Sequence, residues 1–297
     1  MRVTQNYSIN SLLRQINYTR ERINTYQRNL ATGKRINQIS DDPEKIETVI
    51  RYRRMLKLNR RFEENIDNAL DFMYFTSQVL DDSANVMARL KELAIQGIDS
   101  IGDDEWNAFV NQYNEMLEKL VQLANSRFKD RYLFGGVNVN KAPFVLAADR
   151  SRVTPNPEGI SGALRVELGN GKIDTYNVSG QEAFVGTVNV FDVVIALRDA
   201  FANRDARQIN QLLPQLDAAM DQILQVNAKL GARINRFQLL RQQYDSEDLR
   251  IQEFLSKVQD TDLAKTVVNL QMEQTALETA LRALAQTVNI SLVDFIG

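Results

Sequence analysis

The side chains that could carry out chemistry in this sequence are mainly carboxylates, because the chain contains no cysteine and no histidine. That absence excludes disulfides, thiolate nucleophiles, zinc sites of the usual type and every Ser-His-Asp triad. It also removes the side chain most often used for proton transfer near neutral pH. The sequence therefore argues against an enzyme, although a carboxylate enzyme housed in the middle of the chain stays a weaker alternative.

Acidic residues occur together at three places, Asp41-Asp42, Asp81-Asp82 and Asp103-Asp104-Glu105. A calcium site or a catalytic acid pair would use such residues, but none of the three has the spacing of an EF-hand loop. Two of them lie where a helix is expected to begin, and there a carboxylate caps free N–H groups and favours the positive end of the helix dipole. We predict helix caps, no metal and no cofactor.

Six basic side chains within eleven residues form the best candidate for nucleic-acid binding. They are Arg51, Arg53, Arg54, Lys57, Arg60 and Arg61. On a helix they could follow phosphates, but Arg53 and Arg60 fall on the expected apolar stripe and glutamates flank the run at ion-pairing distance. The net charge of −2 gives no global attraction to nucleic acid or to anionic membranes. A solvated face or a subunit contact is favoured, and a basic coiled-coil protein that binds nucleic acid remains the alternative.

Proline and glycine divide the sequence into two helical flanks and a short middle. Four of the five prolines and eight of the thirteen glycines lie within residues 135–214. In that middle, Leu164, Val166 and Leu168 alternate with other residues, Asn170-Gly171 is a strong hairpin signal, and Lys172–Val178 is the expected returning strand. We predict an α+β protein, mostly helical, with a small antiparallel β-rich insert that can be removed without loss of the helical core.

The expected boundaries follow the breaks in helical periodicity. Thr32-Gly33 ends the first helix, and Asp42-Pro43 begins the second. The predicted parts are an N-terminal coiled-coil arm and loop, the two halves of an inner helical domain on either side of the insert, and a C-terminal coiled-coil arm. Their ranges are 1–42 for the first arm, 43–134 and 190–259 for the inner domain, 135–189 for the insert and 260–297 for the last arm.

Each terminal arm carries one narrow apolar stripe that steps by three and four residues, which is the pattern of a coiled-coil seam. A single helix cannot bury its own stripe, and isolated helices are marginal in water. We therefore predict that the arms pair with each other and also contact neighbouring copies. The predicted assembly interface consists of Ile9, Leu12, Ile16, Ile23, Leu30, Leu263, Val267, Leu270, Leu277, Leu281, Leu284, Val288 and Phe295.

The two ends of the chain carry no recognisable membrane or secretion signal. No segment approaches the roughly 18 consecutive apolar residues of a membrane span, and the N-terminus lacks an apolar signal region. These general features predict a soluble, cytoplasmic protein. An export route that reads no cleavable signal would leave the same pattern.

Three motifs in the flanks resemble one family. They are Leu30–Asn37 followed by Ser40–Pro43, then Leu230–Arg236, and finally Asp260–Ala264. They are similar, in the same order, to sequences shared by the flagellins and the flagellar hook-associated proteins. The resemblance covers roughly residues 1–140 and 190–297, and the insert is the part that varies freely in this family.

Within that family, three features favour the branch that joins hook to filament over the filament-forming flagellins. Pro43 follows the paired aspartates, where flagellins more often continue with alanine. Tyr132–Gly136, with Pro143-Phe144 after it, resembles the start of the outer domain in the junction branch. Ser291–Ile296 resembles the ending of that branch.

The resemblance implies a secreted structural subunit of the bacterial flagellum that joins the hook side to the flagellin filament by self-assembly of its terminal helices. It implies further copies in a ring, hook-associated protein 1, flagellin and a flagellar export chaperone as partners, and neither nucleic acid nor membrane. The arms would pass disordered through the flagellar type III export apparatus and fold on assembly, when pairing offsets their ordering entropy. A short flagellin is the alternative within the family.

Overall fold

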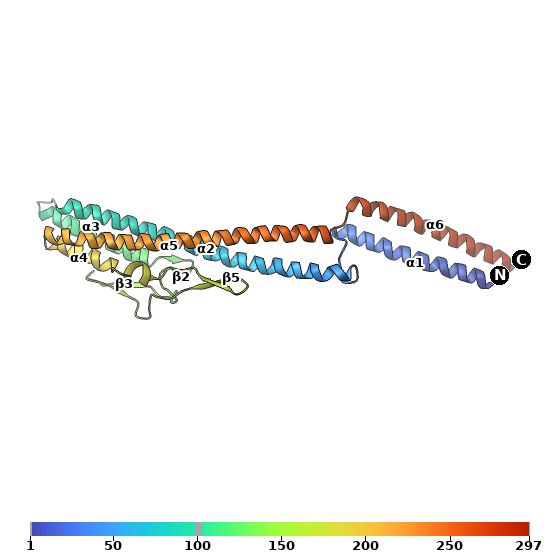
Figure 1. Ribbon diagram of the computed structural model, residues 1–297, viewed down its shortest axis with the longest axis horizontal. Coiled ribbons are helices and arrows are strands. Elements are labelled where there is room, and N and C mark those ends of the chain that lie inside the picture. Colours follow the sequence, from blue (N-terminus) through green and yellow to red (C-terminus); the bar gives the residue numbers. More distant parts are fainter. Residues whose placement is uncertain (1, 99–102, 297) are drawn as a thin grey trace. The chain divides into compact units, whose positions relative to one another are not determined.

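The chain forms long helices, with a group of short β-hairpins on one side of the helices from the middle of the chain (Figure 1). The computed structural model describes the backbone of residues 2–98 and 103–296, and the side chains of residues 7, 9–98 and 105–286. The helices in these ranges are α1 (Arg2–Thr32), α2 (Pro43–Ile98), α3 (Asp103–Ala124), α4 (Val190–Ala202), α5 (Ala206–Gln259) and α6 (Leu263–Ile296), with a π-helical turn η1 (Gln181–Val185) before α4. The strands are β1 (Arg127–Phe128), β2 (Arg131–Tyr132), β3 (Phe144–Leu146), β4 (Val153–Pro155), β5 (Arg165–Gly169) and β6 (Lys172–Thr175).

The residues divide into two compact units. The arm unit consists of Met1–Leu58 and Glu247–Gly297, and the core unit consists of Asn59–Ser246. Helices α2 and α5 contribute to both. None of the described helices has the length and apolar character needed to cross a membrane.

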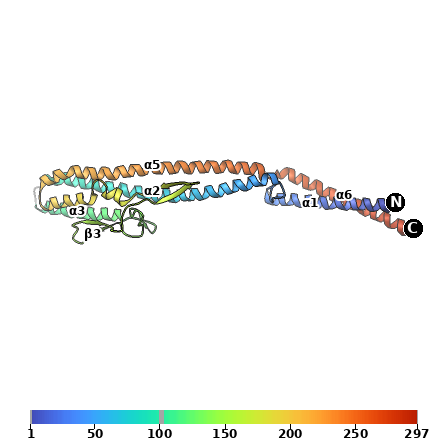
Figure 2. The same ribbon diagram turned by 60° about the horizontal axis from the view of Figure 1, so that its bottom comes forward.

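In the arm unit, α1 and α6 lie side by side in both views (Figures 1 and 2). The two helices run antiparallel, because Lys34 bridges Asp260 while Arg22, further back along α1, forms an ion pair with Glu273, further forward along α6. Gly33 ends α1 with φ +69°, the left-handed conformation that the sequence predicts for it. The predicted pairing of the terminal helices is therefore present within one chain.

The core unit is built from apolar stripes of α2 and α5 that repeat at the helical period in the sequence, together with α3 and α4. On α2 the stripe is fully buried from residue 66 to residue 94, and on α5 Leu216, Ile223, Leu230 and Phe237 are buried. These stripes share one continuous apolar cluster with α3 and α4. The prediction of a mostly helical α+β protein is confirmed.

The strands form three separate antiparallel hairpins, β1–β2, β3–β4 and β5–β6. The hairpin predicted at Asn170-Gly171 joins β5 to β6, and Gly171 takes φ +75° as such a tight turn requires. The returning strand ends at Thr175 rather than at Val178. The main-chain pairing ends there because the side chain of Asn177 takes over the hydrogen bonds. Its Oδ1 accepts from Leu164 N at 2.7 Å, and its Nδ2 donates to Gly162 O at 3.1 Å.

The structure argues against the expectation that the insert can be removed without loss of the helical core, because residues of the insert are buried in that core. Phe144 of the insert and Phe184 of η1 contact Phe191 of α4, with ring centroids 5.0 and 5.6 Å away, and all three rings are buried in the same cluster as the helices. Gln222 of α5 holds the same region, because its Oε1 accepts the N–H groups of Thr187 and Val188 at 2.8 and 3.0 Å. The middle of the chain is thus part of the main core.

Candidate assembly interface

The predicted interface residues of α1 occupy the side of the helix that faces α6. Ile16 and Ile23 are buried, and Ile9, Leu12 and Leu30 are partly buried. Between them lies Thr19, a polar side chain that is only 3% exposed. Because a buried polar residue in a seam disfavours other registers, Thr19 helps to fix the alignment of the two arms.

On α6 the predicted stripe separates into two groups. Leu270, Leu277 and Leu284 are partly buried, together with Glu273 and the buried Thr266, on the side that faces α1. Leu263, Val267 and Leu281 are 54%, 42% and 41% exposed. Val288 and Phe295 lie outside the residues whose side chains are described.

The exposed leucines and valine are among five exposed apolar side chains of α6, which together we call the second row. Val268 and Met272 of the same helix are also exposed, at 54% and 58%. The second row thus consists of Leu263, Val267, Val268, Met272 and Leu281. Since exposed apolar side chains gain free energy when another molecule covers them, the second row is a candidate contact between subunits.

The loop after α1 and the turn before α6 are joined by main-chain hydrogen bonds. Arg35 N donates to Gln259 O at 2.6 Å, and Thr261 N donates to Gly33 O at 2.9 Å. The Arg35 guanidinium also donates to Val258 O at 2.7 Å, and Ile36 packs there with only 1% of its surface exposed. We call this region, residues 33–41 with 258–262, the joint.

Asp41 organises the loop side of the joint. Its Oδ2 accepts the N–H groups of Asn37 and Gln38 at 2.8 and 2.9 Å, and its Oδ1 lies 2.9 Å from Nη2 of Arg28 in α1. Partial burial by itself would raise the pKa of this carboxyl, but the two N–H donors and the Arg28 charge outweigh it and hold the pKa below its ordinary value. The ionised form of Asp41 is thus built into the loop.

Three further acidic residues act at helix ends or on the helix surface, whereas the side chains of Asp103 and Asp104 lie outside the described residues. Asp42 Oδ1 accepts Lys45 N at 3.2 Å at the start of α2, and Asp262 Oδ1 accepts Lys265 N at 3.0 Å at the start of α6, as predicted for caps. Asp81 lies exposed within α2 and accepts from Asn227 of α5 at 2.6 Å. Over the described part of the chain, no group of three or more acidic side chains is arranged to hold a metal ion.

The six basic residues of α2 are all exposed, so the assignment of Arg53 and Arg60 to the apolar stripe is wrong. The buried side of this stretch instead contains Val49, Asn59 and Phe62. The guanidinium groups stay in water because burying an unpaired charge is costly.

Sequence reasoning missed three contributors to this region. Gln259 is buried and donates from Nε2 to Ile36 O at 3.0 Å, but a lone glutamine before a turn gives no signal of that role. Glu273 faces α1 because it pairs with Arg22. Thr266 lies one position before the predicted Val267 and donates from its Oγ1 to Asp262 O at 2.7 Å, but no sequence signal indicated its inward orientation.

Two protein-family models match the N-terminal and C-terminal parts of the chain. The model of the bacterial flagellin N-terminal helical region matches residues 3–139, and the model of the bacterial flagellin C-terminal helical region matches residues 213–296. The chain belongs to the bacterial flagellin family. Proteins of this family are structural, so the chain is a structural subunit of the bacterial flagellum and not an enzyme.

Relatives from both branches of the flagellin family align along most of the chain. The flagellar filament 30.7 kDa core protein of Treponema maltophilum is 22% identical over 268 residues, which cover 86% of this chain and 85% of that protein. Flagellar hook-associated protein 3 of Escherichia coli is 20% identical over 289 residues, which cover 90% of each. The sequence relations therefore include a filament protein and a hook-associated protein.

Among solved structures, the fold is similar to that of a Vibrio parahaemolyticus protein described as flagellar hook-associated. The TM-score is 0.67 at 18% identity, and the match covers 74% of this chain and all of that chain. At this identity the likeness shows the flagellin-family fold.

Proposed function

We propose that this flagellin-family subunit occupies the junction between hook and filament, in the role of hook-associated protein 3. The likeness to a hook-associated protein in sequence and in fold supports this position. So do Pro43 and the ending Ser291–Ile296, which resemble the junction branch. The second row carries the assembly part of the proposal, because it is apolar surface that the pairing of α1 with α6 leaves in water.

Assembly would bury the second row against the arms of neighbouring copies. Full burial of one such side chain contributes about 1.5–3 kcal/mol, so residues already half buried contribute less each. The five side chains of the second row, buried at every contact between copies, would together still favour assembly substantially. The chain would thereby form a ring that contacts hook-associated protein 1 on the hook side and flagellin on the filament side. Before assembly, an export chaperone would cover the C-terminal arm.

Deletion of the gene tests the junction role. Cells without this protein should keep their hooks but release flagellin into the medium, since nothing would hold the first filament subunits. Reintroducing the wild-type chain should restore filaments. Cells that lack the protein and still carry attached filaments of normal length would contradict the proposal.

A short flagellin that builds the filament itself is the second candidate. The relation to the Treponema maltophilum filament core protein favours it. Electron microscopy of the purified, polymerised chain separates the two roles. Long filaments formed by this chain alone would support the flagellin role, whereas rings or short assemblies that need added flagellin to extend would support the junction role.

A further inference from the structure

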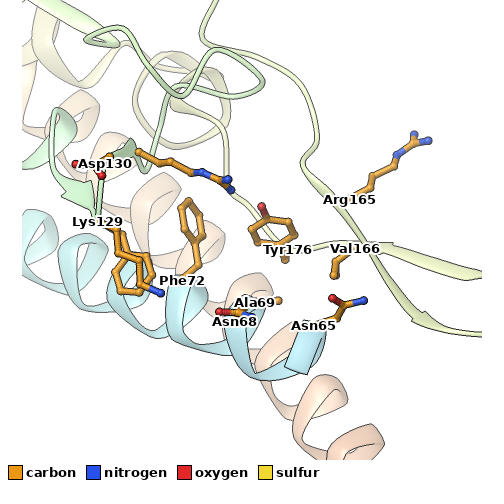
Figure 3. A pocket seen from close by; sticks show the side chains of 11 residues that line it. Asn65, Asn68, Ala69, Phe72, Lys129, Asp130, Arg165, Val166 and Tyr176 are labelled. Atoms are coloured by element: carbon orange, nitrogen blue, oxygen red, sulfur yellow. The ribbon is translucent and has the colours of Figure 1, made fainter. Parts of the chain in front are cut away.

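The core unit contains a cleft of about 510 Å³ between α2, the β1–β2 hairpin and β5 (Figure 3). A cleft of this size is within the range of small-ligand and short-peptide sites. The helical assembly surfaces of the arm unit do not contribute to it. Its lining combines an aromatic floor with a basic rim.

Three aromatic rings form the floor. Phe72 of α2 is 4% exposed and lies edge-to-face with Phe128, at 6.0 Å and 88°, and with Tyr176, at 5.4 Å and 85°. Phe128 and Tyr176 are each partly exposed. Because Phe72 is held between two further rings, the floor is a firm apolar surface that can receive an apolar side chain.

Three cations stand at the rim, Lys129 and Arg131 from the β1–β2 hairpin and Arg165 from β5. Figure 3 shows Lys129 beside the aromatic floor and Arg165 at the opposite edge, with its guanidinium directed outward. The lining includes one carboxylate, Asp130, so it has a net charge of +2, in contrast to −2 for the whole chain.

None of these three cations forms an ion pair with a carboxylate in the described part of the chain. Two arginines elsewhere on the core unit do form such ion pairs, Arg61 with Glu167 and Arg236 with Asp174. The rim therefore gathers three positive charges that have no carboxylate partner among the described residues, and its electrostatic complement is an anion.

We propose that the cleft binds an extended acidic peptide segment that also carries an apolar side chain. The apolar side chain would rest on Phe72, Phe128 and Tyr176, and flanking carboxylates would pair with Arg131 and Arg165, which can each make bidentate contacts. The proposal does not depend on the junction role.

The details of the lining favour a peptide over an acidic sugar. Phe72 meets Phe128 and Tyr176 edge-to-face, so the floor has no single flat platform on which a sugar ring could stack. The amide nitrogens of Asn65 and Asn68 already donate to backbone carbonyls, at 3.0 and 2.8 Å. Their oxygens are thus oriented as acceptors, which suits the N–H groups of an extended peptide backbone.

Fluorescence anisotropy with the full-length chain tests the proposal. The probe is a fluorescein-labelled hexapeptide of alternating glutamate and phenylalanine. We expect saturable binding that weakens at least about ten-fold in the double variant Arg131→Gln/Arg165→Gln, because two charge-assisted contacts are lost. The matched control Arg207→Gln/Lys229→Gln removes two exposed charges elsewhere on the core unit and should leave the affinity within about two-fold.

Two further peptides separate the contributions of floor and rim. Replacing phenylalanine by serine in the probe should weaken binding about ten-fold, and replacing glutamate by lysine should abolish it. No binding of the original probe, or equal binding to the rim variant and the wild type, would overturn the proposal. Displacement of the probe by a glucuronic acid trisaccharide at lower concentration than by the unlabelled peptide would also overturn it, in favour of an acidic sugar.

Discussion

The side-chain amide of Gln259 donates a hydrogen bond of 3.0 Å to the carbonyl oxygen of Ile36, across 223 positions of sequence. Both residues are almost completely buried, at 4% and 1% exposure. Since the main-chain carbonyl of Gln259 also accepts from Arg35 N, this one residue satisfies both a donor and an acceptor of the loop on the opposite side of the joint. The joint is therefore held by specific polar contacts as well as by apolar packing.

Replacing Gln259 by leucine should loosen the joint. The change keeps the side-chain volume but leaves the Ile36 carbonyl buried without its donor, at a cost of about 1–3 kcal/mol. Amide hydrogen exchange of residues 33–37, measured by mass spectrometry, should accelerate between about 5- and 150-fold. Gln252→Leu, at an exposed position of the same helix, is the control. Equal exchange in the two variants would show that the side-chain bond contributes nothing.

Asp41 should make the loop of the joint sensitive to acid. Its pKa is lowered in the folded chain, so the stabilisation that it provides is complete above the ordinary value of about 3.9 and is lost as the pH falls through the lower, folded value. The amide NMR signals of Asn37 and Gln38 should therefore titrate with a midpoint below about 3.9. They should not show this transition in Asp41→Asn.

The neighbouring Asp42 provides the control for that titration. Asp42 accepts from Lys45 N and not from the N–H groups of residues 37 and 38. In Asp42→Asn the two amide signals should keep the wild-type midpoint. A transition with the same midpoint in Asp41→Asn and in Asp42→Asn would mean that the signals report general acid unfolding and not the protonation of Asp41.

Gly97 of α2 should tolerate no side chain. A Cβ atom placed there would overlap the ring of Phe201, and overpacking of this kind costs about 1–3 kcal/mol. Gly231 is the matched control, because it is also helical and nothing lies within 4 Å of its Cβ position. Thermal unfolding should show a lower Tm for Gly97→Ala and an unchanged or higher Tm for Gly231→Ala, where alanine gains up to about 1 kcal/mol of helix propensity. The reverse order would contradict the close contact with Phe201.

Removal of residues 141–187 should unfold much of the core unit. Phe144 and Phe184 would be lost from the apolar cluster, and the core-facing surface of α4 would become exposed. Gln222→Leu tests the same contact more gently, since it leaves the N–H groups of Thr187 and Val188 without their acceptor. Circular dichroism melts should show a lower Tm for Gln222→Leu than for the exposed Gln225→Leu. A shortened chain that still unfolds cooperatively at the wild-type temperature would restore the idea of a separable insert.

Local and periodic signals were enough to predict most of the fold. The stripe of α2 is buried as predicted because its apolar residues repeat at the helical period over many turns, as Ile66, Met73, Leu80 and Met87 show. The hairpin at Gly171 was predictable because the pair Asn170-Gly171 by itself favours a tight turn in which glycine takes a positive φ. These features need no knowledge of the partner that they pack against.

The joint and the orientation of α6 could not be predicted in this way. Besides its predicted stripe, α6 carries Val268 and Met272 on other parts of its surface, and periodicity alone does not decide which residues face α1. The structure places Thr266 and Glu273 inward, and Glu273 is held there by Arg22. Likewise, the contact of Gln259 with Ile36 exists only after the chain has brought distant segments together. Sequence patterns thus indicate which helices pair, whereas individual polar contacts fix how they are rotated.

The two leucines in the middle of α6 provide the sharpest test of the assembly proposal. Leu277 is partly buried on the side that faces α1, whereas Leu281 is 41% exposed in the second row. Leu281→Asp should leave the melting temperature of the unassembled chain nearly unchanged, yet abolish assembly seen by electron microscopy and sedimentation, because it would bury an unpaired charge between subunits.

Leu277→Ala should instead lower the melting temperature of the unassembled chain, because it weakens the pairing of α1 with α6. The loss of stability should be smaller than the roughly 2–5 kcal/mol typical of a fully buried leucine, since Leu277 is only partly buried. Leu239→Asp introduces the same charge at a position of the core unit that is 66% exposed, and it should affect neither property. Normal assembly of Leu281→Asp would remove the second row from the interface. A melting temperature lowered by many degrees in that variant would instead show that Leu281 is already packed in the free protein, and the C-terminal arm would then not need assembly in order to fold.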